Sequence, residues 1–275
     1  MMKFLGCLRS VFHGWPAICK YPSAARQVLS NLNEAGRGMK LADEWIASDV
    51  GELRQKDTDN PLWDYFSKNE SGPGILKWSH YFEIYHRYFA KFRGRAVNVM
   101  EVGVYSGGSL PMWKWYFGNQ CHVYGVDIEP ACRRYERDGI SVLIGDQKDR
   151  EFWKSVREKI PPIDIFIDDG GHEPEQQMVT MEEMLPALAP GGVFVTEDVH
   201  GVWQPFSAFA TAMVTRLNAA NWAPEKNTHV KTGFQQAIHS IHAYPFMCVV
   251  EKHAIATHHL SLMERGTEWQ PFLDR

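Results

Sequence analysis

The segment 165–177, IFIDDGGHEPEQQ, contains the residue types best suited to chemistry. An apolar run ends in the adjacent carboxylates Asp168 and Asp169, and two glycines separate these from His172. Carboxylate oxygens are suitable ligands for a hard divalent cation, and the imidazole of histidine can accept a proton near neutral pH. The spacing therefore indicates a site that binds a cation and moves a proton. A structural histidine at a helix start is the alternative for His172.

A second acidic pair, Glu197 and Asp198, ends the apolar run GVFVTED at 192–198. One helical stretch separates this run from the run that ends at Asp169, so we expect neighbouring parallel strands whose ends lie close together. Three carboxylates at one edge would repel one another unless a cation or protons compensate, and hard oxygen ligands favour Mg²⁺. Helix N-caps and solvated loop carboxylates are the alternative.

The segment 101–109, EVGVYSGGS, follows an apolar strand-like run and opens a helix. Its glycines allow a tight turn and a close approach of the backbone to a ligand. Their spacing is GxxxGG, which differs from the GxGxxG of dinucleotide-binding folds. Glu101 precedes the first glycine and could accept hydrogen bonds from an amino group or a ribose. A purely structural turn is the alternative.

Two further acidic residues follow the next two strand-like runs, Asp127 in YGVD and Asp146 in GDQ. A carboxylate in the position of Asp127 commonly binds ribose hydroxyls, and Asp146 could accept from an adenine amino group. A helix N-cap before Pro130 and a loop turn are the respective alternatives. Because ligands of open α/β sheets lie beyond the carboxyl ends of the strands, these groups together favour an adenosine ligand.

The elements that position these residues alternate between strand and helix. The strand-like runs cover 97–103, 122–127, 141–146, 163–169 and 192–198, with helical stretches between them. This alternation predicts an α/β fold with a doubly wound, mostly parallel sheet. The last two runs, 237–244 and 246–253, are separated only by Pro245. Since a parallel crossover needs about a dozen residues or more, we expect an antiparallel hairpin at the C-terminal end of the sheet.

The N-terminal part of the chain has a different pattern. We expect residues 1–94 to form a helical N-terminal extension or lid, and residues 95–275 to form the domain that carries the sites. The run KWSHYFEIYHRYFAKF at 77–92 spaces its aromatic residues by three and four, which predicts an amphipathic helix. Four residues of this helix could line a ligand pocket, namely His80, Tyr81, Tyr85 and His86, and a packing role in the core is the alternative.

The amino-acid composition limits which classes of binding partner and which cellular compartment we expect. Hydrophobic residues make up 44% and charged residues 23%, as is ordinary for a soluble globular protein. A net charge of −4 argues against a nucleic-acid partner. Five cysteines without a CxxC pair indicate neither a disulfide framework nor a zinc site, and they fit a reducing cytoplasm. The N-terminal apolar run FLGCL is too short for a signal sequence or a membrane span, so no membrane partner is expected.

The motifs EVGVYSGG, GVD, GDQ, IDDGGH and TED, in this order, resemble those of class I S-adenosylmethionine-dependent methyltransferases. More narrowly, they resemble the metal-dependent sugar O-methyltransferases of macrolide biosynthesis and the related cephalosporin hydroxylase-like proteins, over about residues 75–252. The resemblance implies a Rossmann-like, seven-stranded sheet in a catalytic domain, residues 95–275, that binds S-adenosylmethionine and Mg²⁺. The cofactor-binding residues that it implies are Glu101, Gly103, Tyr105, Ser106, Gly107, Ser109, Asp127, Asp146 and Asp168.

The same resemblance implies the metal ligands and the base. The expected Mg²⁺ ligands are Asp169, Glu197 and Asp198. His172 is the expected base, and the implied reaction moves a methyl group from S-adenosylmethionine to a hydroxyl, on the sugar of a glycosylated small molecule such as a natural product or a glycan. His200 and Trp203 are candidate acceptor contacts, although VHGVWQPF does not match an acceptor-binding loop. A second copy of the chain is a further candidate partner.

Two interpretations from other classes stay open. Asp169, His172 and His200 could form the two-histidine, one-carboxylate site of an Fe(II) hydroxylase. The adjacent carboxylates favour Mg²⁺ instead, and an adenosine edge has no role in that scheme. The chain could also be a non-catalytic protein that binds S-adenosylmethionine but neither responds to metal nor transfers a methyl group.

Overall fold

The computed structural model describes residues 22–45, 59–202, 204–220, 222–223, 228–263 and 265–266. The chain divides into two compact units, residues 1–57 and 58–275. Within the first unit the described part is mainly helix α2 (Pro22–Asp43), a 22-residue helix that begins with proline and has Lys40 in its last turn. Proline is favoured at the first helical position, and a cation near the C-terminus complements the helix dipole. The domain boundary expected at residue 94 stays a prediction.

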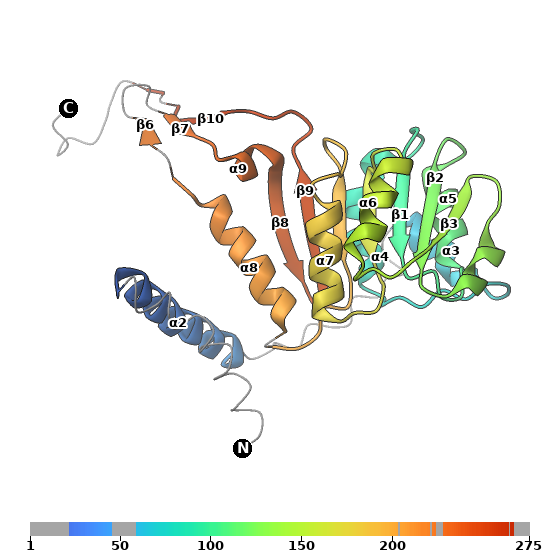
Figure 1. The fold of residues 1–275 in the computed structure, drawn as a ribbon, viewed down its shortest axis with the longest axis horizontal. Coiled ribbons are helices and arrows are strands. Elements are labelled where there is room, and N and C mark those ends of the chain that lie inside the picture. The colour runs from blue at the N-terminus through green and yellow to red at the C-terminus, as the bar shows by residue number, and fades with distance from the viewer. Residues whose placement is uncertain are drawn as a thin grey trace, which may run out of the picture. The chain divides into compact units, whose positions relative to one another are not determined.

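The second unit is built on a seven-stranded sheet with the strand order β3-β2-β1-β4-β5-β9-β8 (Figure 1). The strands are β1 (Asn98–Val102), β2 (His122–Asp127), β3 (Ile140–Ile144), β4 (Ile165–Asp168), β5 (Val193–Thr196), β8 (Ile238–Tyr244) and β9 (Met247–Lys252). Strands β1 to β5 run parallel to one another. Strand β9 is antiparallel to both β5 and β8. The predicted doubly wound, mostly parallel sheet with an antiparallel C-terminal hairpin is therefore confirmed.

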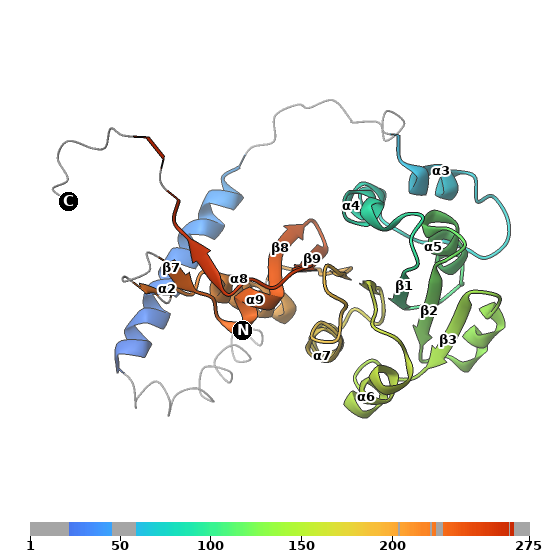
Figure 2. The ribbon, with the colours of Figure 1, turned by 90° about the horizontal axis from the view of Figure 1, so that it is seen from above.

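Helices cover both faces of this sheet (Figure 2). One face packs against α3 (Pro61–Ser67), α4 (Tyr81–Phe89) and α5 (Ser109–Phe117), and the other against α6 (Arg150–Lys159), α7 (Pro174–Met184) and α8 (Pro205–Leu217). Successive side chains of a strand point to opposite faces, so Val99 belongs to the first core and Met100 to the second. Burial on both sides explains why these strands are continuous apolar runs rather than alternating ones.

The helix expected at 77–92 begins later, at Tyr81, and residues 77–80 are not helical. It continues after Phe89 as the 3-10 helix η2 (Ala90–Phe92). The side chains of Lys77 and Trp78 reach carboxylates more than 90 residues away in sequence. These tertiary contacts hold the segment out of the helix despite its helical pattern. Likewise, the helix expected after Asp127 is the 3-10 helix η3 (Pro130–Tyr135).

A second, three-stranded antiparallel sheet has the order β10-β7-β6. Its strands are β6 (Trp222–Ala223), β7 (Thr228–Val230) and β10 (His259–Ser261), and the short helix α9 (Gly233–Ala237) precedes β8. Strands of two or three residues are too short to produce a periodic pattern, so the sequence did not predict them. No helix among the described residues is long and apolar enough to cross a membrane.

Candidate active site

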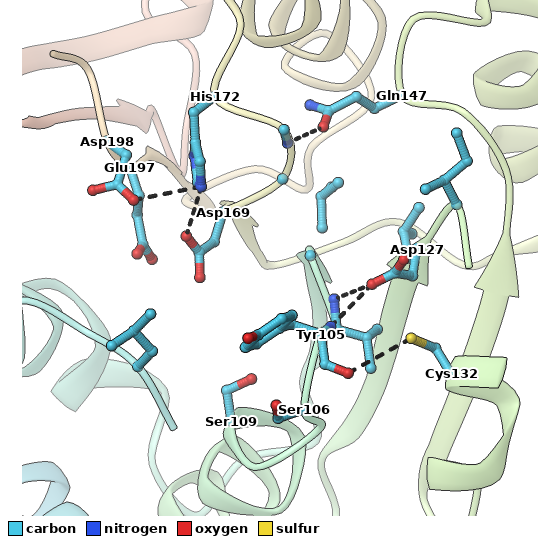
Figure 3. Close-up of a pocket in the computed structure, with 18 of the residues that line it drawn as sticks. Tyr105, Ser106, Ser109, Asp127, Cys132, Gln147, Asp169, His172, Glu197 and Asp198 are labelled. Atoms are coloured by element: carbon cyan, nitrogen blue, oxygen red, sulfur yellow. Dashed lines mark hydrogen bonds and ion pairs between the residues drawn. The ribbon is translucent and has the colours of Figure 1, made fainter. Parts of the chain in front are cut away.

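The loops beyond the carboxyl ends of the parallel strands surround a cavity of about 750 Å³ (Figure 3). This volume is within the range of roughly 300–1,000 Å³ that is usual for small-molecule sites. Most residues predicted to form a site line it: Gly103, Tyr105, Ser106, Ser109, Asp127, Asp146, Asp169, His172, Glu197, Asp198 and His200. Glu101 and Asp168 lie beneath the cavity and are 0% and 1% exposed. Trp203 lies outside the described residues.

The turn between β1 and α5 requires glycine at two of the predicted positions. Gly103 has φ +92°, and a Cβ atom there would lie 1.9 Å from the carbonyl oxygen of Asp169. Gly107 has φ +74°, and its Cβ would lie 2.5 Å from the ring of Tyr135. Only glycine combines a positive φ with such close approach. The glycine-rich turn therefore brings the loop after β1 directly against the loop after β4.

Asp127 holds this turn in place from the end of β2. Its Oδ2 accepts hydrogen bonds from the backbone N–H groups of Val104 (2.9 Å) and Tyr105 (3.0 Å), and its Oδ1 accepts from Glu129 (2.9 Å). A carboxylate has about four acceptor positions, so capacity for a ligand is left. Asp146 follows β3, is exposed, and accepts from the N–H of Lys148.

Gln147, which sequence reasoning did not select, organises the loop after β4. Its Nε2 donates to Asp168 Oδ1 (3.0 Å), and its Oε1 accepts from the N–H of Gly171 (2.8 Å). A Cβ atom at Gly170 would lie 2.0 Å from Gln147 Oε1, so glycine at this position leaves room for the Gln147 amide. Burial raises the pKa of Asp168 to about 7. Within the described residues its Oδ2 has no hydrogen-bond partner. Asp168 therefore supports the loop from below.

The carboxylate–histidine cluster forms the opposite end of the cavity from Asp127 (Figure 3). His172 Nε2 lies 3.5 Å from Asp198 Oδ2 and 3.9 Å from Asp169 Oδ1. One ligand atom from each of these residues lies within 4.8 Å of the others, a spacing that could hold a metal ion. The structure thus brings together Asp169, His172 and Asp198, whereas Glu197, the third expected metal ligand, is not part of this cluster.

Strained backbone is concentrated at this cavity. Tyr105, His172 and Asp198 have φ values of 47°, 58° and 54°, in the left-handed region that non-glycine residues rarely adopt. Phe246 (φ 61°) packs its ring against His200, which also lines the cavity. Such strain costs about 1–3 kcal/mol per residue and persists where surrounding structure enforces it, often at functional sites. These conformations present the His172 and Asp198 side chains to the same space.

Lys77 lies at the centre of a buried group of carboxylates. Its Nζ donates to Asp169 Oδ2 (2.6 Å), Glu101 Oε1 (3.2 Å) and Glu197 Oε2 (3.1 Å), and its side chain is 2% exposed. Burial opposes the charged form, yet Asp169, Glu197 and Glu101 together keep the pKa of Lys77 well above its ordinary value. Sequence reasoning missed this residue because a lysine beside an aromatic helix carries no distinguishing local signal.

The carboxylate of Glu197 is bound mainly by buried side chains. Its Oε1 accepts from the Tyr85 hydroxyl (2.5 Å), both its oxygens contact Lys77, and the residue is 1% exposed. Burial and the Asp169 charge raise its pKa well above the ordinary value. Ser109 Oγ similarly donates to Glu101 Oε2 (2.5 Å). The Tyr85 ring packs in the core, and its hydroxyl also donates a hydrogen bond to the acidic cluster.

Asp198 connects the cluster to an aromatic rim. Its Oδ1 accepts from Trp78 Nε1 (2.9 Å) and from the Tyr81 hydroxyl (3.0 Å), which leaves Oδ2 facing His172. His200 Nε2 lies 3.6 Å from Asp198 Oδ1, and the His200 ring contacts Trp78. Apolar ring surface is thus placed directly beside a candidate metal ligand.

Comparison with known proteins gives this geometry a context. A family profile described as a methyltransferase domain matches residues 100–199. The 8-demethyl-8-alpha-L-rhamnosyl tetracenomycin-C 2'-O-methyltransferase of Streptomyces olivaceus is 34% identical over 206 residues, which are 67% of this chain and 54% of that protein. The chain is related to the S-adenosylmethionine-dependent sugar O-methyltransferases.

Two further relatives support this methyltransferase relationship. The mycinamicin VI 2''-O-methyltransferase of Micromonospora griseorubida is 34% identical over 139 residues, 48% of this chain and 34% of that protein. The structure of MycE methyltransferase with Mg, SAH and mycinamycin VI superposes with a TM-score of 0.58 and 26% identity, over 70% of this chain and 52% of that one. The matched part of the chain spans about half the length of the Streptomyces olivaceus enzyme and of the MycE structure.

Proposed function

We propose that this protein is an Mg²⁺-dependent O-methyltransferase that moves a methyl group from S-adenosylmethionine to a hydroxyl on the sugar of a glycosylated small molecule. The main support is that one cavity combines an end suited to an adenosine with an end suited to a cation and a proton acceptor. The names of the relatives add that one of them methylates a rhamnosyl tetracenomycin-C and another methylates mycinamicin VI.

The proposed adenosine end contains three groups of complementary chemistry. Asp127 has acceptor capacity left for ribose hydroxyls, and Asp146 lines the cavity with a carboxylate for an amino group. Ile128 also lines the cavity and is 67% exposed, so it offers apolar surface for an adenine ring. The turn from Gly103 to Ser109 would enclose the rest of the cofactor.

The proposed metal end contains oxygen ligands that suit Mg²⁺. Asp169 and Asp198 each direct an oxygen toward His172. Glu197 is the third proposed ligand and also lines the cavity, although Lys77 and Tyr85 already use most of its acceptor positions. The crowding of carboxylates is the feature that fits a divalent cation, because the described side chains leave it with an excess of negative charge.

The proposed chemistry divides between bound groups and protein side chains. S-adenosylmethionine would supply the methyl group, and a divalent cation would lower the pKa of the acceptor hydroxyl. His172 would accept the hydroxyl proton at Nε2, and the nearby Asp169 and Asp198 would stabilise the resulting imidazolium. The rim formed by Trp78, His200 and Phe246 would contact the acceptor.

His172 could act either as the base or as a metal ligand, and the identity of the proposed metal decides between these two roles. Imidazole is a good ligand for zinc, copper and iron, whereas Mg²⁺ prefers oxygen. The Fe(II) hydroxylase alternative needs two histidines, but the cluster that could hold a metal among the described residues contains His172 and not His200. The geometry therefore favours methyl transfer.

Calorimetric titration with S-adenosylmethionine, with and without Mg²⁺, tests the proposal directly. We expect S-adenosylmethionine to bind in both conditions. In a separate transfer assay with glycosylated acceptors, we expect methyl transfer only when the metal is present. Binding without transfer to any acceptor would support the non-catalytic interpretation. Bound iron with oxygen-dependent turnover would support the hydroxylase.

Asp127→Ala should weaken S-adenosylmethionine binding by roughly 1–3 kcal/mol, the usual cost of leaving a buried polar group unpaired. The reason is twofold, because Asp127 both faces the ligand and fixes the N–H groups of Val104 and Tyr105. Titration calorimetry measures the effect, and Asp138→Ala, an exposed aspartate before β3, is the matched control. Unchanged affinity in a folded Asp127→Ala variant would exclude Asp127 from the cofactor site.

A further inference from the structure

The acidic end of the cavity has two differently exposed halves. Glu101 and Glu197 form the buried half, with at most 1% exposure. Asp198 forms the half that opens to the cavity, where it faces His172. Asp169 joins the two halves, because its Oδ2 contacts Lys77 and its Oδ1 faces His172.

The Lys77 ammonium is surrounded as a bound metal ion would be. Carboxylate oxygens of Glu101, Asp169 and Glu197 approach its Nζ within 2.6–3.2 Å, and these residues lie at the ends of three different strands of the sheet. Oxygen ligands from carboxylates are the set preferred by Mg²⁺, Mn²⁺ and Ca²⁺. An ammonium in such a group replaces a cation that the carboxylates would otherwise recruit, since like charges this close cannot all stay ionised alone.

The segment that carries Lys77 is fixed on both sides. The N–H of Gly108 donates to the carbonyl oxygen of Gly74, and a Cβ atom at Gly108 would lie 2.4 Å from that oxygen. One residue after Lys77, Trp78 donates to Asp198. Contacts on either side of Lys77 therefore hold its segment in place, and its buried ammonium is not a mobile surface charge.

We propose that Lys77 is a positioning residue that acts as a resident cation: its ammonium occupies a second cation position between Glu101, Asp169 and Glu197, beside the position of the divalent metal. Its single positive charge offsets part of the negative charge of the buried half, and Asp169 Oδ1 is left for the metal side. Four carboxylates, namely Glu101, Asp169, Glu197 and Asp198, would then be balanced by the ammonium, a divalent cation and the net positive charge of S-adenosylmethionine. The metal position rests on the proposed function, whereas the ammonium position does not.

Lys77→Met tests this inference, because methionine keeps an unbranched side chain of similar length without the charge. We expect the variant to bind one more Mn²⁺ ion per chain than the unchanged protein in calorimetric titration of the full chain without S-adenosylmethionine. We also expect Mn²⁺ to raise its melting temperature by more than it raises that of the unchanged protein. Lys91→Met, which removes a half-exposed lysine that pairs with Glu251, is the matched control and should change neither result.

A number of bound ions that does not increase in Lys77→Met, at any affinity, would overturn the inference. If Lys77→Met does not fold, the double variant Lys77→Met, Glu197→Gln restores the charge balance and should fold where the single variant fails. A double variant no more stable than the single one would also overturn it. The proposed function is tested separately, because absence of Mn²⁺ binding by the unchanged protein would contradict only the metal position.

Discussion

His172→Ala should slow methyl transfer by roughly 10²–10⁴-fold, the usual contribution of general acid–base catalysis. The imidazole lies between Asp169 and Asp198, so it can accept a proton from a hydroxyl bound beside these carboxylates. S-adenosylmethionine binding should change little, because the adenosine end of the cavity is formed by other residues. Single-turnover kinetics with a glycosylated acceptor measure the effect, together with calorimetry for the cofactor and for Mn²⁺.

The matched control for this prediction is His239→Ala, an exposed histidine on β8 outside the cavity lining. The variant should retain full transfer and full binding. Near-normal turnover of His172→Ala would show that the metal alone activates the hydroxyl. Lost Mn²⁺ affinity in His172→Ala would instead assign the imidazole as a metal ligand, the other role its distances allow.

Asp169→Asn should raise the Mg²⁺ concentration needed for half-maximal activity by about 100-fold or more. Residues that only support a metal ligand typically contribute about 10–100-fold to affinity or activity, and Asp169 is a proposed ligand itself. It is also the carboxylate shared by both halves of the acidic cluster, with Lys77 on one oxygen and His172 near the other. Activity titrated against Mg²⁺ and Mn²⁺ gives the shift.

Asp138→Asn makes the same substitution at an exposed position before β3 and should leave the titration unchanged. The thermal stability of Asp169→Asn should be compared with that of the unchanged protein, because the substitution also removes a partner of Lys77. A folded Asp169→Asn variant with an unaltered Mg²⁺ requirement would remove Asp169 from the metal site.

The sheet could be predicted because its parallel strands are buried on both faces. β2 matches the predicted run 122–127 at both ends, and β4 and β5 lie inside their predicted runs. The start of α4 could not be predicted, because the pattern of 77–80 is helical while its side chains bind distant carboxylates. Local periodicity does not report such contacts.

The site was predictable where motif residues lie at the end of a strand or within two residues after it, as Asp127, Asp169 and Asp198 do. The site was not predictable where a residue forms hydrogen bonds with a residue far away in the sequence. Lys77 meets Glu197 across 120 positions of sequence, and Gln147 reaches Asp168 across 21. Both residues line the cavity, but a single lysine or glutamine in a loop has no sequence pattern of its own.

The most direct measurement of the central claim is transfer of a labelled methyl group from S-adenosylmethionine to a panel of rhamnosylated and macrolide acceptors, first with excess chelator and then with Mg²⁺ added back. We expect no methylated sugar in the presence of the chelator and restored transfer after addition of Mg²⁺, with the label on a sugar oxygen. Undiminished transfer in excess chelator, or labelling of a carbon or nitrogen atom instead, would contradict it.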